Sequence, residues 1–175
     1  IVVDPGTGFY LADTAMRDYL RSSAAHSTAV IDGAGQGNPL ATFLWEAEVG
    51  SGLQTAAATE REIMFEGRLT PGPAGDRPLH HRRMRLHRSE PLIVIEDLVQ
   101  SEGRHRLELI FTLHPDCTVR LSEGNARRAL ITAGDTELSL EADEGCRLEV
   151  HRGERGPLRG WYSPGFGRVA PCPQV

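Results

Sequence analysis

The sequence has 175 residues, with 19 basic and 24 acidic side chains and a formal net charge of −5. A chain of this length can bury its own core, and its acidic balance argues against a general nucleic-acid-binding protein. No apolar run approaches the roughly 20 residues of a membrane-spanning helix, so we expect no membrane partner either. The chain begins at Ile1, within an apolar stretch and without a recognisable signal peptide, so we expect it to be part of a longer polypeptide.

The first predicted elements are a strand over 1–3 and the only expected helix, over 14–21. The helix reads TAMRDYLR, and Asp13 or Thr14 offers a side-chain oxygen to cap its first backbone amides. Met16 and Leu20 are four residues apart, so both fall on one side of the helix, where they would pack against a core.

Beyond the helix, apolar and polar residues alternate with a period of two, which predicts strands. The stretch 106–113 is the clearest case, and 92–95 is a continuous apolar run typical of a strand covered on both faces. This pattern predicts an all-β fold with one short helix, a large antiparallel, supersandwich-like β-sandwich formed as a single domain over 1–175. The predicted strands after the helix are 27–31, 42–48, 54–65, 80–88, 92–95, 106–113, 118–121, 128–132, 136–141 and 146–150.

Two Gly/Pro-rich segments and three cysteines complete the pattern. Residues 70–78 are expected to join two strands as a long hairpin loop, and 156–175 to run across the sheets or to begin further strands. Cys117, Cys146 and Cys172 are widely spaced, without a CxxC motif. The first two fall in or beside predicted strands, so buried thiols are favoured over a disulfide.

Two side chains near the N-terminus could carry chemistry, and each also has a structural interpretation. Asp4 ends the first strand directly before a Pro-Gly turn, so its carboxylate could satisfy that turn or serve as a metal ligand. His26 stands where the chain enters the strand 27–31, as a hydrogen-bonded structural residue or as a second ligand. The residues alone leave both alternatives open.

The stretch 80–88 is strongly basic, since seven of its nine residues are Arg or His. His81 and His87 share a strand face but stand about 20 Å apart, so they cannot bind one ion together. The stretch is either a solvated face paired with acidic neighbours or a contact surface for an acidic polysaccharide. The candidate acidic partners are Glu62, Glu66 and Glu90.

Several short motifs, taken in order, resemble a known family. Residues 4–10 read DPGTGFY, 17–28 read RDYLRSSAAHST and 31–33 read IDG. This series resembles the opening of the C-terminal β-sandwich domain of the heparinase II/III-like polysaccharide lyases, with its D-P-G-T-x-x-Y and R-x-Y-x-R-S-x-x-A-H-N-T-V-x-V-D-G patterns. Later segments resemble the family's H-x-R, L-V-V-x-D and G-W-x-S-x-x-Y-G segments. They are LHHRR at 79–83, LIVIED at 92–97 and GWYSPGFG at 160–167.

The resemblance implies a bacterial polysaccharide lyase whose N-terminal α/α toroid precedes this domain, with the active cleft between the two. Such enzymes cleave uronic-acid polysaccharides, including heparan sulfate and alginate, by β-elimination. The family's catalytic Asn, Tyr and H-x-H histidine lie upstream of D-P-G, so we expect no catalytic residue in this chain and no activity from it alone. The implied partners are an acidic polysaccharide and the toroid of the same polypeptide.

The resemblance also implies site residues. Asp4 and His26 match two ligands of the family's zinc or similar divalent cation, whose third ligand belongs to the H-x-H segment. Ser27 replaces the family's usual Asn. Tyr10, Tyr19 and Arg21 are candidates for this chain's side of the substrate cleft, and their plainer roles are packing for the tyrosines and a surface ion pair for the arginine.

Two other functions are compatible with the same fold. One is a non-catalytic carbohydrate-binding or structural β-sandwich, because a fold does not determine a function. The other is an envelope-polysaccharide biosynthesis protein that modifies a uronate polymer as it is made. A periplasmic or secreted location is expected for a lyase of this kind.

Overall fold

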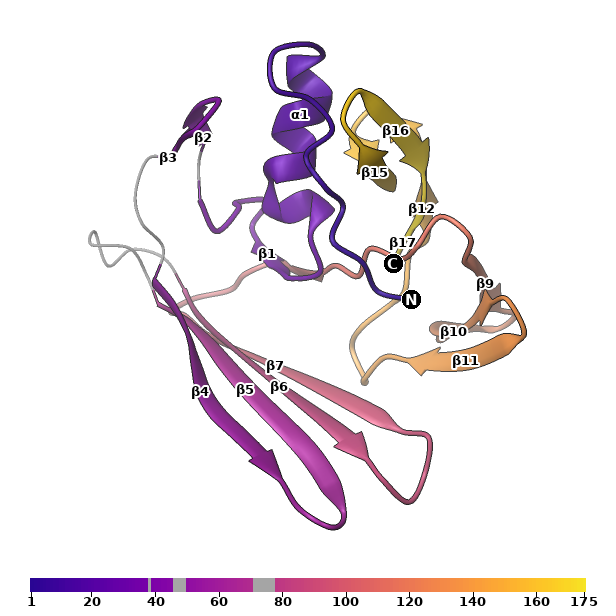
Figure 1. The fold of residues 1–175 in the computed structure, drawn as a ribbon. Helices are drawn as coiled ribbons and strands as arrows, with labels where there is room; N and C mark the ends of the chain where they lie inside the picture. The colour runs from indigo at the N-terminus through magenta and orange to yellow at the C-terminus, as the bar shows by residue number, and fades with distance from the viewer. Residues whose placement is uncertain (38, 46–49, 71–77) are drawn as a thin grey trace. The chain divides into compact units, whose positions relative to one another are not determined.

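The computed structural model describes residues 1–37, 39–45, 50–70 and 78–175 (Figure 1). It divides into two compact units, one comprising Ile1–Phe43 with Leu107–Val175 and the other comprising Leu44–Arg106. Antiparallel strands dominate, and the described residues contain one α-helix, so the predicted all-β class is confirmed. No helix in this described part has the length and apolarity needed to cross a bilayer.

The first unit contains the only helices among the described residues and most of the short strands. Its elements are α1 (Thr14–Arg21), the 3-10 helix η1 (Ser23–Ala25), β1 (Ala29–Ile31), β2 (Pro39–Ala41), β8 (Leu107–Leu109), β9 (Thr118–Ser122), β10 (Asn125–Ala133), β11 (Thr136–Glu141), β12 (His151–Arg152), β13 (Glu154–Arg155), β14 (Leu158–Arg159), β15 (Trp161–Gly165), β16 (Arg168–Pro171) and β17 (Pro173–Gln174). The second unit contains β3 (Leu44–Trp45), β4 (Gly50–Ala58), β5 (Glu62–Thr70), β6 (Leu79–His87) and β7 (Ile93–Gln100).

The helix forms where the sequence predicts it. The Asp13 side chain caps it by accepting a hydrogen bond from the Met16 amide at 3.1 Å. Met16 and Leu20 are fully buried on one side, in a core cluster with Tyr19, Ala25 and Trp161. The helix therefore holds the loop that precedes it against the C-terminal strands.

Residues 106–113, predicted to form one strand, bond to β1 and to both ends of the chain. Only β8 is regular, and it pairs antiparallel with β1. The next residues bond to both ends of the chain, since the Thr112 carbonyl accepts from the Val3 amide at 3.0 Å, and Phe111 exchanges two backbone bonds with Val175. The predicted N-terminal strand is accordingly reduced to a bridge between Val2 and Leu113.

The second unit is an antiparallel sheet in the order β4-β5-β6-β7. The prediction of one strand over 54–65 is wrong, because the chain turns back at 59–61. The Thr59 hydroxyl accepts from the amides of Arg61 and Glu62 and stabilises that turn. Of the predicted strand 42–48, Leu44–Trp45 is observed and 46–49 lies outside the described residues.

Three further predictions concern the loop 70–78, the strand 146–150 and the C-terminal tail. Most of the predicted loop 70–78 lies outside the described residues, but the strands that it joins, β5 and β6, are antiparallel neighbours as expected. The predicted strand 146–150 is wrong, because a turn at Gly145 leaves that segment outside any strand. The C-terminal tail forms the short strands β14 to β17, as its second interpretation allowed.

The three cysteines are all free thiols. Cys117 and Cys172 are buried, and burial raises the pKa of the Cys172 thiol to about 11. Cys146 is exposed, which corrects the expectation of a buried position, because it follows the turn at Gly145 instead of lying in a strand.

Candidate functional site

The loop 4–10 is held in a defined shape by its contacts with β15 and β16. Its backbone bonds to the C-terminal hairpin twice, from the Ser163 amide to the Pro5 carbonyl and from the Gly167 amide to the Gly8 carbonyl, both at 2.8 Å. Gly6 has a φ of +72°, and a Cβ there would stand 2.8 Å from the Ser163 carbonyl oxygen. Only glycine fits at this position, so the loop lies directly on β15.

Asp4 and His26 meet at the start of this loop. One carboxylate oxygen of Asp4 accepts from the Gly6 amide at 2.8 Å, so the predicted turn is present. The other, Oδ2, lies 3.4 Å from His26 Nε2. His26 Nδ1 stands 2.8 Å from the Ser22 carbonyl. A carbonyl can only accept, so Nδ1 carries a proton, and Nε2 is the ring nitrogen that faces Asp4.

This pair fits part of a divalent cation site. Two ligands of a tetrahedral zinc, each about 2.0–2.1 Å from the ion, stand roughly 3.3–3.4 Å apart. The Asp4–His26 separation matches that value, and it is longer than the usual 2.7–3.2 Å of an N–H···O hydrogen bond. Within the described residues no group of three His, Cys, Asp or Glu side chains could hold a metal ion, so Asp4 and His26 do not form a complete metal site by themselves.

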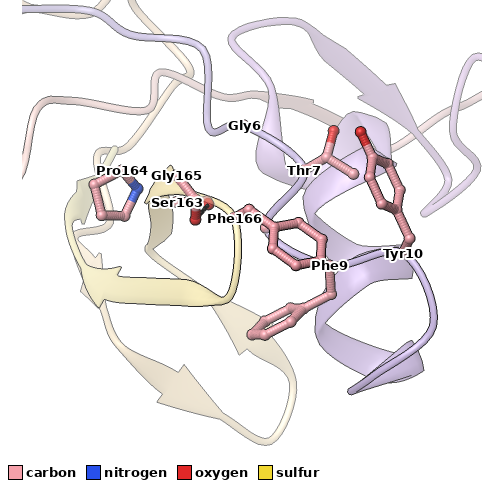
Figure 2. A pocket seen from close by; sticks show the side chains of 9 residues that line it. Gly6, Thr7, Phe9, Tyr10, Ser163, Pro164, Gly165 and Phe166 are labelled. Atoms are coloured by element: carbon pink, nitrogen blue, oxygen red, sulfur yellow. Dashed lines mark hydrogen bonds between the residues drawn. The ribbon is translucent and has the colours of Figure 1, made fainter.

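A shallow cavity of about 250 Å³ opens between the loop 4–10 and the β15–β16 turn (Figure 2). Tyr10, one of the predicted cleft residues, lines it and is half exposed. Its ring contacts those of Phe43 and Phe166, with centroids 5.6 and 5.5 Å away. Tyr10 is thus placed on an open surface beside the loop that carries Asp4.

The other two predicted cleft residues have structural contacts. Tyr19 is buried in the core, and its hydroxyl accepts from the Gly160 amide at 3.0 Å. Burial raises the pKa of this hydroxyl above its ordinary value of 10.0. Arg21 donates to the Ala41 carbonyl at 3.1 Å and remains partly exposed. The geometry therefore gives Tyr19 a packing role, while Arg21 keeps a partly open position.

The basic stretch of β6 is paired with carboxylates from neighbouring strands. Arg83 binds Glu66 at 3.1 Å and His87 lies 3.7 Å from Glu90, as the solvated-face interpretation expects. Arg85 also binds Glu96, at 3.1 Å. These pairs leave less positive charge for an acidic polysaccharide than the sequence suggests.

One buried network in β6 and β7 has no counterpart in the sequence predictions. Asp97 accepts from His80 at 2.6 Å and from Arg82 at 2.7 and 3.1 Å, and its side chain is 3% exposed. Burial alone would raise the pKa of Asp97, but hydrogen bonds from His80 and Arg82 outweigh it and hold that pKa below its ordinary value of 3.8. The network depends on the pairing of Arg82 with Asp97 across the two strands, which one strand's pattern does not reveal.

Comparison with known proteins identifies the family. The family model for the heparinase II/III-like C-terminal domain matches residues 1–175, the entire chain. The chain therefore belongs to this family, as its motifs indicated. No curated protein matches the chain.

Proposed function

We propose that this chain is the C-terminal domain of a polysaccharide lyase that cleaves a uronic-acid-containing polymer by β-elimination. It contributes one wall of the cleft and two metal ligands, and it is inactive alone. The family match over the whole chain is the observation that carries this proposal. The approach of Asp4 and His26 at the end of a fixed loop supports the metal site.

The reaction removes the proton at C5 of a uronate and expels the oxygen at C4. The C5 proton becomes acidic enough only if the neighbouring carboxylate is neutralised, and a base and an acid must then move protons. We assign none of these steps to a residue of this chain. Of the three predicted cleft residues, Tyr10 and Arg21 are exposed enough to contact a polymer.

A divalent cation such as zinc would supply a fixed positive centre at Asp4 and His26. Neighbouring residues of this chain orient the two candidate ligands. The Ser22 carbonyl fixes the tautomer of His26, and the Gly6 amide fixes the rotation of the Asp4 carboxylate. Together they would fasten the loop 4–10 to the start of β1, a structural role that suits a site beside the cleft.

The lyase proposal is tested with the full-length protein on heparan sulfate, alginate and related uronate polymers. Each cleavage leaves a conjugated unsaturated uronate at the new end, so ultraviolet absorbance should rise with time. Cleavage of at least one polymer is expected. Absence of product from every uronate polymer would overturn the proposal, and binding without cleavage would favour the non-catalytic alternative.

The metal proposal is tested by measuring bound metal in the purified full-length protein. We expect about one zinc or similar ion per chain, and loss of most of it in His26→Ala and in Asp4→Asn. His114→Ala is a matched control, because His114 also lies 3.5 Å from an aspartate, Asp116, on an exposed surface. Metal retained by His26→Ala, or lost equally in His114→Ala, would contradict the assignment.

A further inference from the structure

Three aromatic side chains gather on the surface of the first unit instead of packing in its core. Tyr10, Phe43 and Phe166 are 50%, 80% and 76% exposed. Tyr10 stands between the other two, with interplanar angles of 50° to Phe43 and 39° to Phe166. The three neighbouring rings make an exposed apolar patch, and clustered exposure of this kind marks an interaction site more often than scattered exposure does.

The patch borders the cavity between the loop 4–10 and the β15–β16 turn. Figure 2 shows Tyr10 and Thr7 on the loop side and Phe166 on the turn side. The support beneath it is rigid, because Gly6 and Gly8 lie against Ser163 and the turn bonds back to the loop. A surface held in this way is formed before any ligand arrives, which lowers the entropic cost of binding.

The chemistry of the cavity selects one kind of occupant. The residues that line it are Gly6, Thr7, Gly8, Phe9, Tyr10, Ser163, Pro164, Gly165 and Phe166. Among these described residues none carries a charge at neutral pH, and Thr7, Tyr10 and Ser163 contribute hydroxyl groups to the lining. At about 250 Å³ the cavity is smaller than the roughly 300–1,000 Å³ that encloses a drug-sized molecule, so it suits a single ring.

We propose that Tyr10, Phe43 and Phe166 form a stacking subsite for one pyranose ring of the polysaccharide. A pyranose has a face of C–H bonds with partial positive charge, which the negative face of an aromatic ring attracts. Its rim of hydroxyls needs the kind of neutral donors and acceptors that border the cavity. The substrate class rests on the proposed function, and the subsite adds that the polymer is held here by its ring and not by its carboxylate.

This distinction has a measurable consequence. Contacts with a uronate carboxylate or a sulfate weaken as salt is added, because ions screen exposed charges. Stacking on neutral rings is not screened. The contribution of the patch to affinity should therefore be the same at low and high salt.

The test measures binding of size-defined tetrasaccharides from alginate and from heparan sulfate to the full-length protein, by calorimetry at two salt concentrations. Phe166→Ala and Phe43→Ala should each weaken binding of at least one tetrasaccharide by about three- to ten-fold, by the same factor at both concentrations. Tyr10→Phe keeps the ring and should change affinity by less. Leu11→Ala is the matched control, because Leu11 is 84% exposed beside Tyr10 and does not line the cavity.

Unchanged affinity in both phenylalanine variants, an equal loss in Leu11→Ala, or a loss that disappears at high salt would overturn the subsite. Saturation transfer from aromatic protons to the sugar C–H protons gives a second readout, and it should be weaker in Phe166→Ala and in Phe43→Ala than in the unaltered protein. Cleavage of a polymer with unaltered binding in the variants would leave the lyase proposal standing and remove the subsite. Binding that depends on these rings, without cleavage of any polymer, would support the subsite and overturn the lyase proposal.

Discussion

The two units of this protein are stabilised in different ways. The first unit buries two clusters of apolar side chains, and Leu20, in the cluster beside α1, is completely inaccessible. The second unit is one four-stranded antiparallel sheet, and large apolar side chains remain exposed along one of its faces. By register these residues are Phe65, Met84, Leu86, Ile93 and Ile95.

The same face of that sheet also carries a charged network whose central carboxylate is 3% exposed. His80 and Arg82 lie four and two residues from Met84, so they point to the same side of β6. There they meet Asp97, opposite Arg82 in β7. The comparison teaches that the described residues of the first unit bury apolar clusters, whereas those of the second unit leave apolar side chains exposed and bury the carboxylate of a charged network.

The largest effect is expected from breaking that network. Asp97→Asn removes the carboxylate between His80 and Arg82 and should destabilise the second unit by about 3 kcal/mol, because two buried donors lose their charged acceptor. Hydrogen exchange should show faster opening of β6 and β7 and unchanged protection of α1. Equal loosening of both units, or no loss of protection in β6, would contradict the comparison.

The pH dependence of the second unit follows from the same group. The pKa of Asp97 is depressed in the folded state, so its contribution is fully present above its ordinary value of 3.8 and is lost as pH falls through the folded pKa. Protection of β6 and β7 should therefore decline below about pH 4. In Asp97→Asn that part of the acid dependence should be missing, which hydrogen exchange at two pH values can check.

Two substitutions to alanine test whether apolar packing contributes more to the stability of the first unit than to that of the second. Leu20→Ala creates a cavity in the first unit and should cost about 3 kcal/mol. Ile93→Ala removes a side chain that is 60% exposed in the second unit and should cost about 1 kcal/mol or less. Urea unfolding followed by hydrogen exchange would measure both, and a larger cost for Ile93→Ala would refute the contrast.

A smaller effect is expected at the contact between α1 and the C-terminal strands. Tyr19→Phe keeps the packed ring but removes the hydroxyl that accepts from the Gly160 amide. Gln174 Oε1 also accepts from that amide, at 3.3 Å, so the loss should be only about 1 kcal/mol. If Tyr19 contacts substrate instead, polysaccharide binding should fall while stability stays constant.

Local sequence signals predicted the local structure well. The capping aspartate and the four-residue spacing of Met16 and Leu20 placed α1, and alternation located most of the strands. The prediction failed where a side chain other than glycine or proline makes a turn, as at Thr59 between β4 and β5. It also failed in 106–113, where the partners are the two ends of the chain and not a single neighbouring strand.

The candidate site was predicted in part, through motifs more than through geometry. The motifs singled out Asp4, His26 and Tyr10, and the structure places the first two together. Nothing in a single sequence shows that Phe43 and Phe166 approach Tyr10, because they come from distant segments and no periodicity links them. Tyr19 occupies the packing position that was the alternative to a cleft role, because a tyrosine in a motif does not reveal which side of the helix is buried.

The loop 4–10 depends on residues translated more than 150 positions later. Ser163 and Gly167 hold its backbone, and Val175 completes the ladder beside Phe111. During synthesis the loop leaves the ribosome first, but it can acquire its final conformation only after β15 and β16 have emerged. A polypeptide that stops before β15 would thus carry both candidate ligands without the backbone contacts that hold the loop 4–10 in place.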